Sequence, residues 1–394
     1  MTTDERAGST RSAQVRRSGY IPTLDGWRTI AVFAVIAFHA RPLHIGKLNL
    51  GGLQSYGDRG VQLFFAISGI LICSRLLEEQ RLHGTISLRG FYVRRLFRIQ
   101  PAAIAMLAAV VLLAMAGVLH VGLGATMASL FSFRNFFDAL GGTTTPDDRY
   151  TVHFWSLAVE EHFYLLLPAL LILARRRLIP VLVTLACVSM IWPPMAHRWG
   201  FTENTFSYKR TDLALQDLLV PALLAVLLTY PAVRALMLRV SGRGVLIFAV
   251  VGAILLSERF AGGHLTHQIT CVGFPLIITS TMLHPEEWLG RLLETRLFTF
   301  LGRVSYSLYL WQQLFFIRRT ETSVLHFVQS WPWNLAGALS LAIASYFFIE
   351  KPLIRLGHRF APPATPGRAD LQTPSTDLAS DRMAYRGAST SSKS

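Results

Sequence analysis

Apolar segments recur along the chain from Ile21 to Leu356, and this recurrence limits the possible folds more than any other feature. About 20 apolar residues suffice for a helix to cross the ~30 Å hydrocarbon layer of a membrane. Ten candidate helices of this kind lie at 22–42, 60–78, 101–121, 153–174, 178–196, 212–231, 244–260, 265–283, 298–317 and 334–353. Only 15% of the 394 residues are charged, against about 25% in soluble domains. The sequence therefore predicts an all-α, polytopic bundle of about ten transmembrane helices.

The basic residues predict the orientation of this bundle. The chain has 38 Lys+Arg and 23 Asp+Glu, a net charge of +15. If the N-terminus is cytoplasmic, 24 of the 38 basic residues fall in inside segments and 11 in outside segments. This positive-inside bias predicts that both termini are cytoplasmic. No nucleic-acid-binding motif accompanies the charge, so the expected partner is the lipid bilayer and not a nucleic acid.

The domain organisation follows from composition. Residues 1–20 form a basic tail without the small-residue cleavage pattern of a signal peptide. Residues 21–356 form one membrane domain, and residues 357–394, rich in Pro, Ser, Thr and Ala, are expected to be a disordered cytoplasmic tail. No second folded domain is expected.

The first predicted helix carries two unusual polar residues, Arg28 and His39. Charged side chains are costly inside a membrane, so they usually face a cavity or a partner. Eleven residues separate the two by roughly 16 Å along one helix face. Arg28 is a candidate for binding a phosphate and His39 for moving a proton. The alternative is an interfacial arginine and a histidine that bonds a neighbouring helix.

A cluster of three arginines, Arg94, Arg95 and Arg98, precedes the third predicted helix on the cytoplasmic side. Arg94 and Arg98 are four residues apart and share a helical face, so together they are candidates for gripping a polyphosphate. The alternative is an ordinary positive-inside cluster.

The fourth predicted helix contains His153 and the adjacent carboxylates Glu160 and Glu161. Helical spacing places His153 and at least one carboxylate on the same stripe, an arrangement suited to acid–base catalysis. The HExxH zinc pattern is missing from the sequence, and no metal site is predicted. Near the C-terminal end of the bundle, Ser305, Tyr306 and Tyr309 offer hydroxyl and aromatic surface for an acceptor substrate, or, alternatively, for helix packing and an aromatic belt.

Six sequence pieces, in order, resemble the bacterial integral-membrane acyltransferase type 3 family over about residues 20–356. The first three are Leu24-Asp25-Gly26-x-Arg28 with His39, Leu63-Phe64-Phe65-x-x-Ser68-Gly69, and Arg94-Arg95-x-x-Arg98-Ile99-x-Pro101. The other three are His153-x-Trp155-Ser156-Leu157-Ala158-Val159-Glu160-Glu161-x-Phe163-Tyr164, Leu301-Gly302-x-x-Ser305-Tyr306-Ser307-Leu308-Tyr309-Leu310-Trp311, and Ile349-Glu350-Lys351-Pro352.

The resemblance implies a multi-pass enzyme of the bacterial inner membrane that moves an acyl group, expected to be acetyl, from acyl-CoA to a hydroxyl. Acetyl-CoA would be the donor substrate, with no bound cofactor, and the acceptor a carbohydrate or a glycosylated, macrolide-like molecule. In the family the residues matching His39 and Arg28 are essential. The chain departs from the family pattern at Gln62, His162 and Gln312, which puts acceptor-side details in doubt. We expect the stand-alone form of these enzymes, in which no extracytoplasmic esterase-like domain follows the membrane domain.

The pieces combine into one mechanistic hypothesis. Acyl-CoA would bind to Arg28 and the cytoplasmic arginine cluster, while His39 acts as general base or transient acyl carrier. Glu160 or Glu161 would orient a histidine, either His39 or His153. Ser68 and Trp155 would line the pocket. The competing function is a transporter or flippase of lipid-linked saccharides, which also explains buried acids and aromatic residues.

Overall fold

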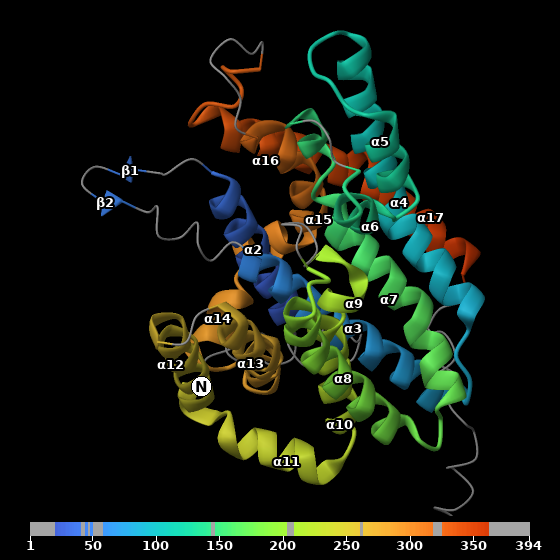
Figure 1. The fold of residues 1–394 in the computed structure, drawn as a ribbon. Helices are drawn as coiled ribbons and strands as arrows, with labels where there is room; N and C mark the ends of the chain where they lie inside the picture. The colour runs from blue at the N-terminus through green and yellow to red at the C-terminus, as the bar shows by residue number, and fades with distance from the viewer. Residues whose placement is uncertain are drawn as a thin grey trace, which may run out of the picture.

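A computed structural model describes residues 20–40, 44–45, 48–49, 58–142, 146–202, 209–260, 263–317 and 325–361. Nearly all of this part of the chain is helical (Figure 1), and its only strands are β1 (His44–Ile45) and β2 (Leu48–Asn49), which pair antiparallel. The prediction of an all-α fold is therefore confirmed apart from this small hairpin.

A helix occupies each of the ten predicted segments. These helices are α2 (Pro22–His39), α3 (Asp58–His83), α4 (Leu88–Met115), α7 (Phe154–Leu173), α8 (Leu178–Arg198), α10 (Gln216–Leu227), α12 (Val245–Phe260), α13 (Gly263–Leu283), α15 (Arg296–Phe316) and α16 (Trp333–Ser345). The last continues through a π-helical turn at Tyr346–Glu350 into α17 (Lys351–Phe360). Shorter helices connect them: α5 (Leu123–Leu130), α6 (Arg134–Ala139), α9 (Thr211–Ala214), α11 (Pro231–Val240) and α14 (Trp288–Leu293), with 3-10 turns at Pro146–Tyr150 and Gly242–Gly244.

Fewer helices than expected are long and apolar enough to cross a membrane by themselves. In the part of the chain that the structure describes there are five, α3, α4, α7, α8 and the α16–α17 unit, or six if the bent pair α10–α11 is one span. The prediction of about ten spans is thus not confirmed. One physical reason is that α10 and α12 have only 12 and 16 residues. Another is that α2, α13 and α15 contain polar residues that lower their hydropathy.

The core is built around α2, which packs against both α3 and α15. In Figure 1 these helices lie at the centre, with α11 to α13 at lower left and α4 and α5 at upper right. Glycines allow the close crossings, because they leave room for a neighbouring backbone. A Cβ on Gly302 would overlap the carbonyl oxygen of Asp25, and one on Gly60 would lie 2.6 Å from the carbonyl oxygen of Ala31. The resulting contacts bring the polar residues of α2, α3 and α15 together.

The predicted tails lie almost wholly outside the described residues. Of the basic tail at 1–20 only Tyr20 is described. Of the predicted tail at 357–394 the structure describes residues 357–361, where α17 continues to Phe360. The cytoplasmic placement of both termini stays a prediction.

Candidate active site

A cavity in the centre of the bundle collects most of the predicted site residues, and we call it the arginine pocket. Its volume is about 80 Å³, space for a few water-sized groups. It lies between α2, α3, α4, α7 and α15. Its polar lining consists of Arg28, Ser68, Arg95, Arg98, Ser156, Glu160, Tyr164, Arg303, Ser305, Tyr306 and Tyr309. Four arginines thus line one cavity with the carboxylate of Glu160, and Arg95 and Arg28 lie within electrostatic range of that carboxylate.

Arg28 is held in place from its own helix. Its Nη1 donates to Asp25 Oδ1 over 2.7 Å, and Tyr20 Oη donates to the other oxygen of Asp25 over 2.6 Å. Burial and this hydrogen bond raise the pKa of Tyr20, so the hydroxyl keeps its proton and remains a donor. Asp25 is therefore occupied on both oxygens, which fixes the direction of the Arg28 side chain toward the pocket.

Glu160 forms a three-membered polar cluster. Ser68 Oγ donates to Glu160 Oε1 over 2.7 Å, and Tyr164 Oη lies 3.2 Å from both Glu160 Oε2 and Ser68 Oγ. The partners of Glu160 are thus a serine and a tyrosine, and not the histidine that the sequence led us to expect. Hydrogen bonds of this kind hold a carboxylate at a fixed position inside a membrane protein.

The three arginines of α4 point in different directions. The guanidinium of Arg95 lies over the ring of Tyr164, 4.7 Å from its centre, and both Arg95 and Arg98 line the pocket. Arg94 instead pairs with Glu79 of α3 over 3.2 Å. Arg94 and Arg98, which we predicted to act as a pair, thus lie apart, and Arg95 and Arg98 are the arginines of α4 that line the pocket.

Glu161 faces away from the arginine pocket. It lines a separate cavity of about 240 Å³, together with Tyr92, Gln100 and Leu165. Consecutive residues of a helix point about 100° apart, which explains why two adjacent carboxylates serve different cavities.

The two predicted histidines, His153 and His39, are not among the residues that line the arginine pocket. His153 directly precedes α7, so it is not part of the helical stripe that the sequence predicted. It is 2% exposed, and neither ring nitrogen has a hydrogen-bond partner among the described residues. Its ring packs edge-on against Tyr309, which lines the pocket. His39, the last residue of α2, lies within electrostatic range of His153, and its Nδ1 is 2.9 Å from the carbonyl oxygen of Val35.

Tyr309 links the pocket to these histidines. Its hydroxyl lies 2.6 Å from Ser156 Oγ and donates to the carbonyl oxygen of His153 over 3.0 Å. Polar groups thus extend from Glu160 in the pocket to His153 behind it.

Comparison with known proteins shows the family of the chain. A family model described as an acyltransferase domain matches residues 21–350. The chain belongs to this acyltransferase family.

Relatives of known name support this membership. The chain is 29% identical over 371 residues to the peptidoglycan O-acetyltransferase OatA of Listeria monocytogenes, covering 86% of this chain and 56% of the relative. It is 29% identical over 374 residues to the putative peptidoglycan O-acetyltransferase YrhL of Bacillus subtilis, with the same coverage. A putative O-acetyltransferase of Staphylococcus aureus is 30% identical over 87% of this chain and 58% of its own length. The chain thus spans just over half the length of these relatives, and no solved structure matches it.

The residues predicted to contact the acceptor or to line the pocket are divided between two cavities. Ser305 is buried at the arginine pocket, and the Tyr306 hydroxyl donates to the carbonyl oxygen of Ile99 over 2.8 Å. Trp155 lines a different and larger cavity, on the other side of Phe65. Of the proposed acceptor residues, therefore, Ser68, Ser305, Tyr306 and Tyr309 lie together and Trp155 lies apart.

Glu350 lies near the arginine pocket, although it is not among the residues that line it. Its place in Ile349-Glu350-Lys351-Pro352, at the end of the last predicted helix, predicts an anchor at the membrane interface. Instead it is 2% exposed, accepts a hydrogen bond from Ser307 over 2.9 Å, and lies within electrostatic range of Arg98 and Arg28. Its inward position comes from the π-helical turn at Tyr346–Glu350, a deformation often found at functional sites.

Proposed function

We propose that this acyltransferase moves an acetyl group from acetyl-CoA to a hydroxyl of a cell-envelope carbohydrate at the bacterial inner membrane. The observation that carries the proposal is the arginine pocket, whose lining includes four arginines and the carboxylate of Glu160 inside an apolar bundle. Charge of one sign is costly in a membrane unless it serves a ligand of opposite charge. The phosphates of CoA are such a ligand, and guanidinium groups bind phosphate oxygens in pairs.

The size of the pocket decides which end of the donor enters it. A volume of about 80 Å³ admits a few water-sized groups, so only the narrow pantetheine arm of the donor would pass the level of Glu160, with the thioester beyond it toward His39. The phosphates would then remain at the arginine side, which the predicted topology places toward the cytoplasm. Acyl-CoA would thus lie with its charged part inside and its thioester directed into the bundle.

His39 is the proposed general base. The acceptor hydroxyl attacks the thioester carbonyl carbon, its proton passes to the imidazole of His39, and the C–S bond breaks with CoA thiolate as the leaving group. The proton on His39 then neutralises the thiolate. Arg28 and His39 occupy opposite ends of α2, roughly 16 Å apart, which suits a donor that enters from one side and an acceptor that approaches from the other.

The names of the relatives support a carbohydrate acceptor, since two of them are named for peptidoglycan. The comparisons offer no support for the alternative of a saccharide transporter or flippase.

The proposal is tested with the full chain purified in detergent. We expect acetyl-CoA to be consumed with transfer of its labelled acetyl group to a soluble muramyl disaccharide, detected by mass spectrometry as a gain of one acetyl mass. Uptake of a lipid-linked saccharide into vesicles without any use of acetyl-CoA would contradict it.

A further inference from the structure

A second cavity, larger than the arginine pocket, lies beside it. This cavity, of about 540 Å³, lies on the other side of Phe65 and Val61, which line both cavities. It lies between α3, α7, α8, α10 and α13. We call it the amide pocket because three glutamines, Gln62, Gln216 and Gln268, contribute to its wall. Its volume is in the range of ordinary small-molecule sites, about 300–1,000 Å³.

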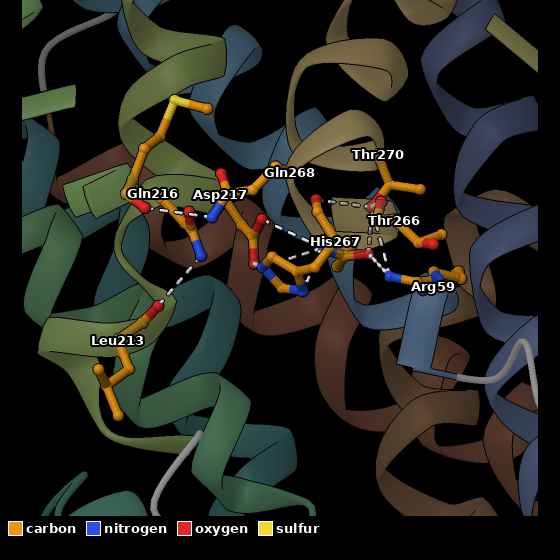
Figure 2. A network of polar contacts seen from close by, with 10 residues as sticks. Arg59, Leu213, Gln216, Asp217, Thr266, His267, Gln268 and Thr270 are labelled. Carbon is orange, nitrogen blue, oxygen red and sulfur yellow. Dashed lines mark hydrogen bonds and ion pairs between the residues drawn. The ribbon is translucent and has the colours of Figure 1, made fainter. Parts of the chain in front are cut away.

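A closed polar network forms one wall of the amide pocket. Figure 2 shows His267 between Asp217 on one side and Thr270 and Arg59 on the other. His267 Nε2 lies 3.2 Å from Asp217 Oδ2, and the amide nitrogen of Gln62 lies 3.2 Å from Asp217 Oδ1 and 3.0 Å from His267 Nδ1. Gln62 thus ties the carboxylate of α10 to the imidazole of α13.

The same glutamine is fixed from its other end. Its oxygen accepts hydrogen bonds from Arg59 over 3.0 Å and from Thr270 over 2.9 Å, while Arg59 also pairs with Glu258 over 3.7 Å. The positive charge of Arg59 is therefore balanced by Glu258. The wall as a whole presents matched donors and acceptors and no excess of positive charge.

Two further amides at the pocket have an unused acceptor. Gln216, which is 1% exposed, donates weakly to the carbonyl oxygen of Leu213 over 3.4 Å, and Gln268 donates to that of Met190 over 3.1 Å. The Oε1 atoms of both have no hydrogen-bond partner among the described residues. A buried polar atom without a partner costs about 1–3 kcal/mol, so the wall beside the cavity carries unused acceptor capacity.

We propose that the amide pocket is the acceptor subsite and that it binds a neutral glycan unit through its hydroxyl and N-acetyl groups. Amide and carboxylate side chains match the paired donor and acceptor character of such groups, and Trp155 and Phe65 offer apolar surface to a sugar ring. A polyphosphate would not be favoured, because Asp217 is the charged group nearest the centre of the network. The role of the glycan as acetyl acceptor rests on the proposed function, whereas its binding in the amide pocket does not.

Its position fits that role. The lining residues come from the beginnings of α3, α10 and α13 and from the end of α8, which the predicted topology places on the extracytoplasmic side. The arginine pocket is its neighbour, and its lining on α3 and α7 continues to Ser68 and Glu160, one turn beyond Phe65 and Ser156. Val61 and Phe65 line both cavities, so movement of these two side chains would bring a sugar hydroxyl into contact with the donor.

The test is binding of an N-acetylglucosamine tetramer to the purified full chain, measured by isothermal titration without any donor. We expect Asp217→Asn and Gln216→Leu each to weaken binding tenfold or more, and His264→Ala, a change at the exposed rim that does not endanger folding, to weaken it severalfold. The matched control is Asp212→Asn, since Asp212 lies five residues away and bonds Trp192 and Arg210. It should bind like the unaltered chain.

Failure of this inference is distinguishable from failure of the proposed function. Equal binding by the unaltered chain and all three pocket variants, or displacement of the tetramer by CoA alone, would overturn the acceptor subsite. Neither result depends on acetyl transfer. Conversely, tetramer binding that follows the pocket variants while acetyl-CoA is never consumed would support a glycan site and contradict the acyltransferase mechanism.

Discussion

The arginine pocket and the amide pocket are neighbours with opposite chemistry. The first is small and is lined by four arginines and Glu160. The second is several times larger and has glutamines, histidines and one buried carboxylate, with its arginine balanced by Glu258. Under the proposed function this difference in charge would separate an anionic donor from a neutral acceptor, because guanidinium groups that bind phosphate would gain little from a sugar.

The arginine pocket should be lost first if the α2–α15 crossing is widened. In Gly302→Ala the added Cβ overlaps the Asp25 backbone, so the two helices must separate and Arg28 must move. We expect loss of acetyl transfer and a lower melting temperature in detergent, while tetramer binding at the amide pocket weakens less. Gly252→Ala in α12 is the control, because its Cβ would meet nothing within 4 Å.

His39→Ala should abolish transfer without unfolding the protein. Loss of a general base typically costs about 10²–10⁴-fold in rate, and His39 is the last residue of α2, where a smaller side chain leaves the helix intact. The rate of acetyl transfer at equal protein level measures this effect. Normal activity of purified His39→Ala protein would remove the base from the mechanism.

The adjacent carboxylates offer a sharper test of the arginine pocket. Glu160→Gln removes the carboxylate that lines the arginine pocket, and we expect a fall in kcat of about 10²-fold. Glu161→Gln changes a residue of a different cavity and should lower kcat less than tenfold. Equal losses in the two variants would show that the division of the carboxylates between cavities has no catalytic meaning.

Tyr309→Phe should lower kcat by a smaller factor, because it breaks the contact between the arginine pocket and His153. The change removes the hydrogen bonds to Ser156 and to the His153 carbonyl oxygen, each worth about 0.5–1.5 kcal/mol. We expect kcat to fall about tenfold while the KM for acetyl-CoA stays within twofold. Tyr306→Phe is the comparison, since its hydroxyl only bonds the Ile99 carbonyl oxygen. A larger loss in Tyr306→Phe would place the link elsewhere.

The sequence was sufficient to predict the helices and the family, because both are expressed in local patterns. Long apolar runs gave all ten helix positions, and short motifs gave Arg28, Ser68, Arg98, Glu160 and Tyr309, which the structure brings to one cavity. Hydropathy alone could not show how many of these helices span the membrane unaided, since polar site residues occupy some of them.

Two parts of the site could not be foreseen, and both depend on contacts distant in sequence. Gln62 bonds Asp217 and His267, which lie 155 and 205 residues further along the chain. Gln62 was noticed only as a departure from the family pattern. Glu350 looked like an interfacial anchor until the π-helical turn directed it inward. The side chains of Arg94 and Glu161 likewise point where neighbouring helices allow, and the spacing of residues along a single helix cannot predict this.

The central claim is that the arginine pocket binds the acyl-CoA donor, and the KM for acetyl-CoA tests it most directly. We compare Arg98→Gln, in the pocket, with Arg94→Gln, whose guanidinium pairs with Glu79. A charge-assisted hydrogen bond is worth about 1.5–3 kcal/mol, so Arg98→Gln should raise the KM for acetyl-CoA about tenfold or more, and Arg94→Gln less than twofold. The KM for the saccharide should change in neither. An unchanged KM for acetyl-CoA in Arg98→Gln, or equal increases in both variants, would contradict the account.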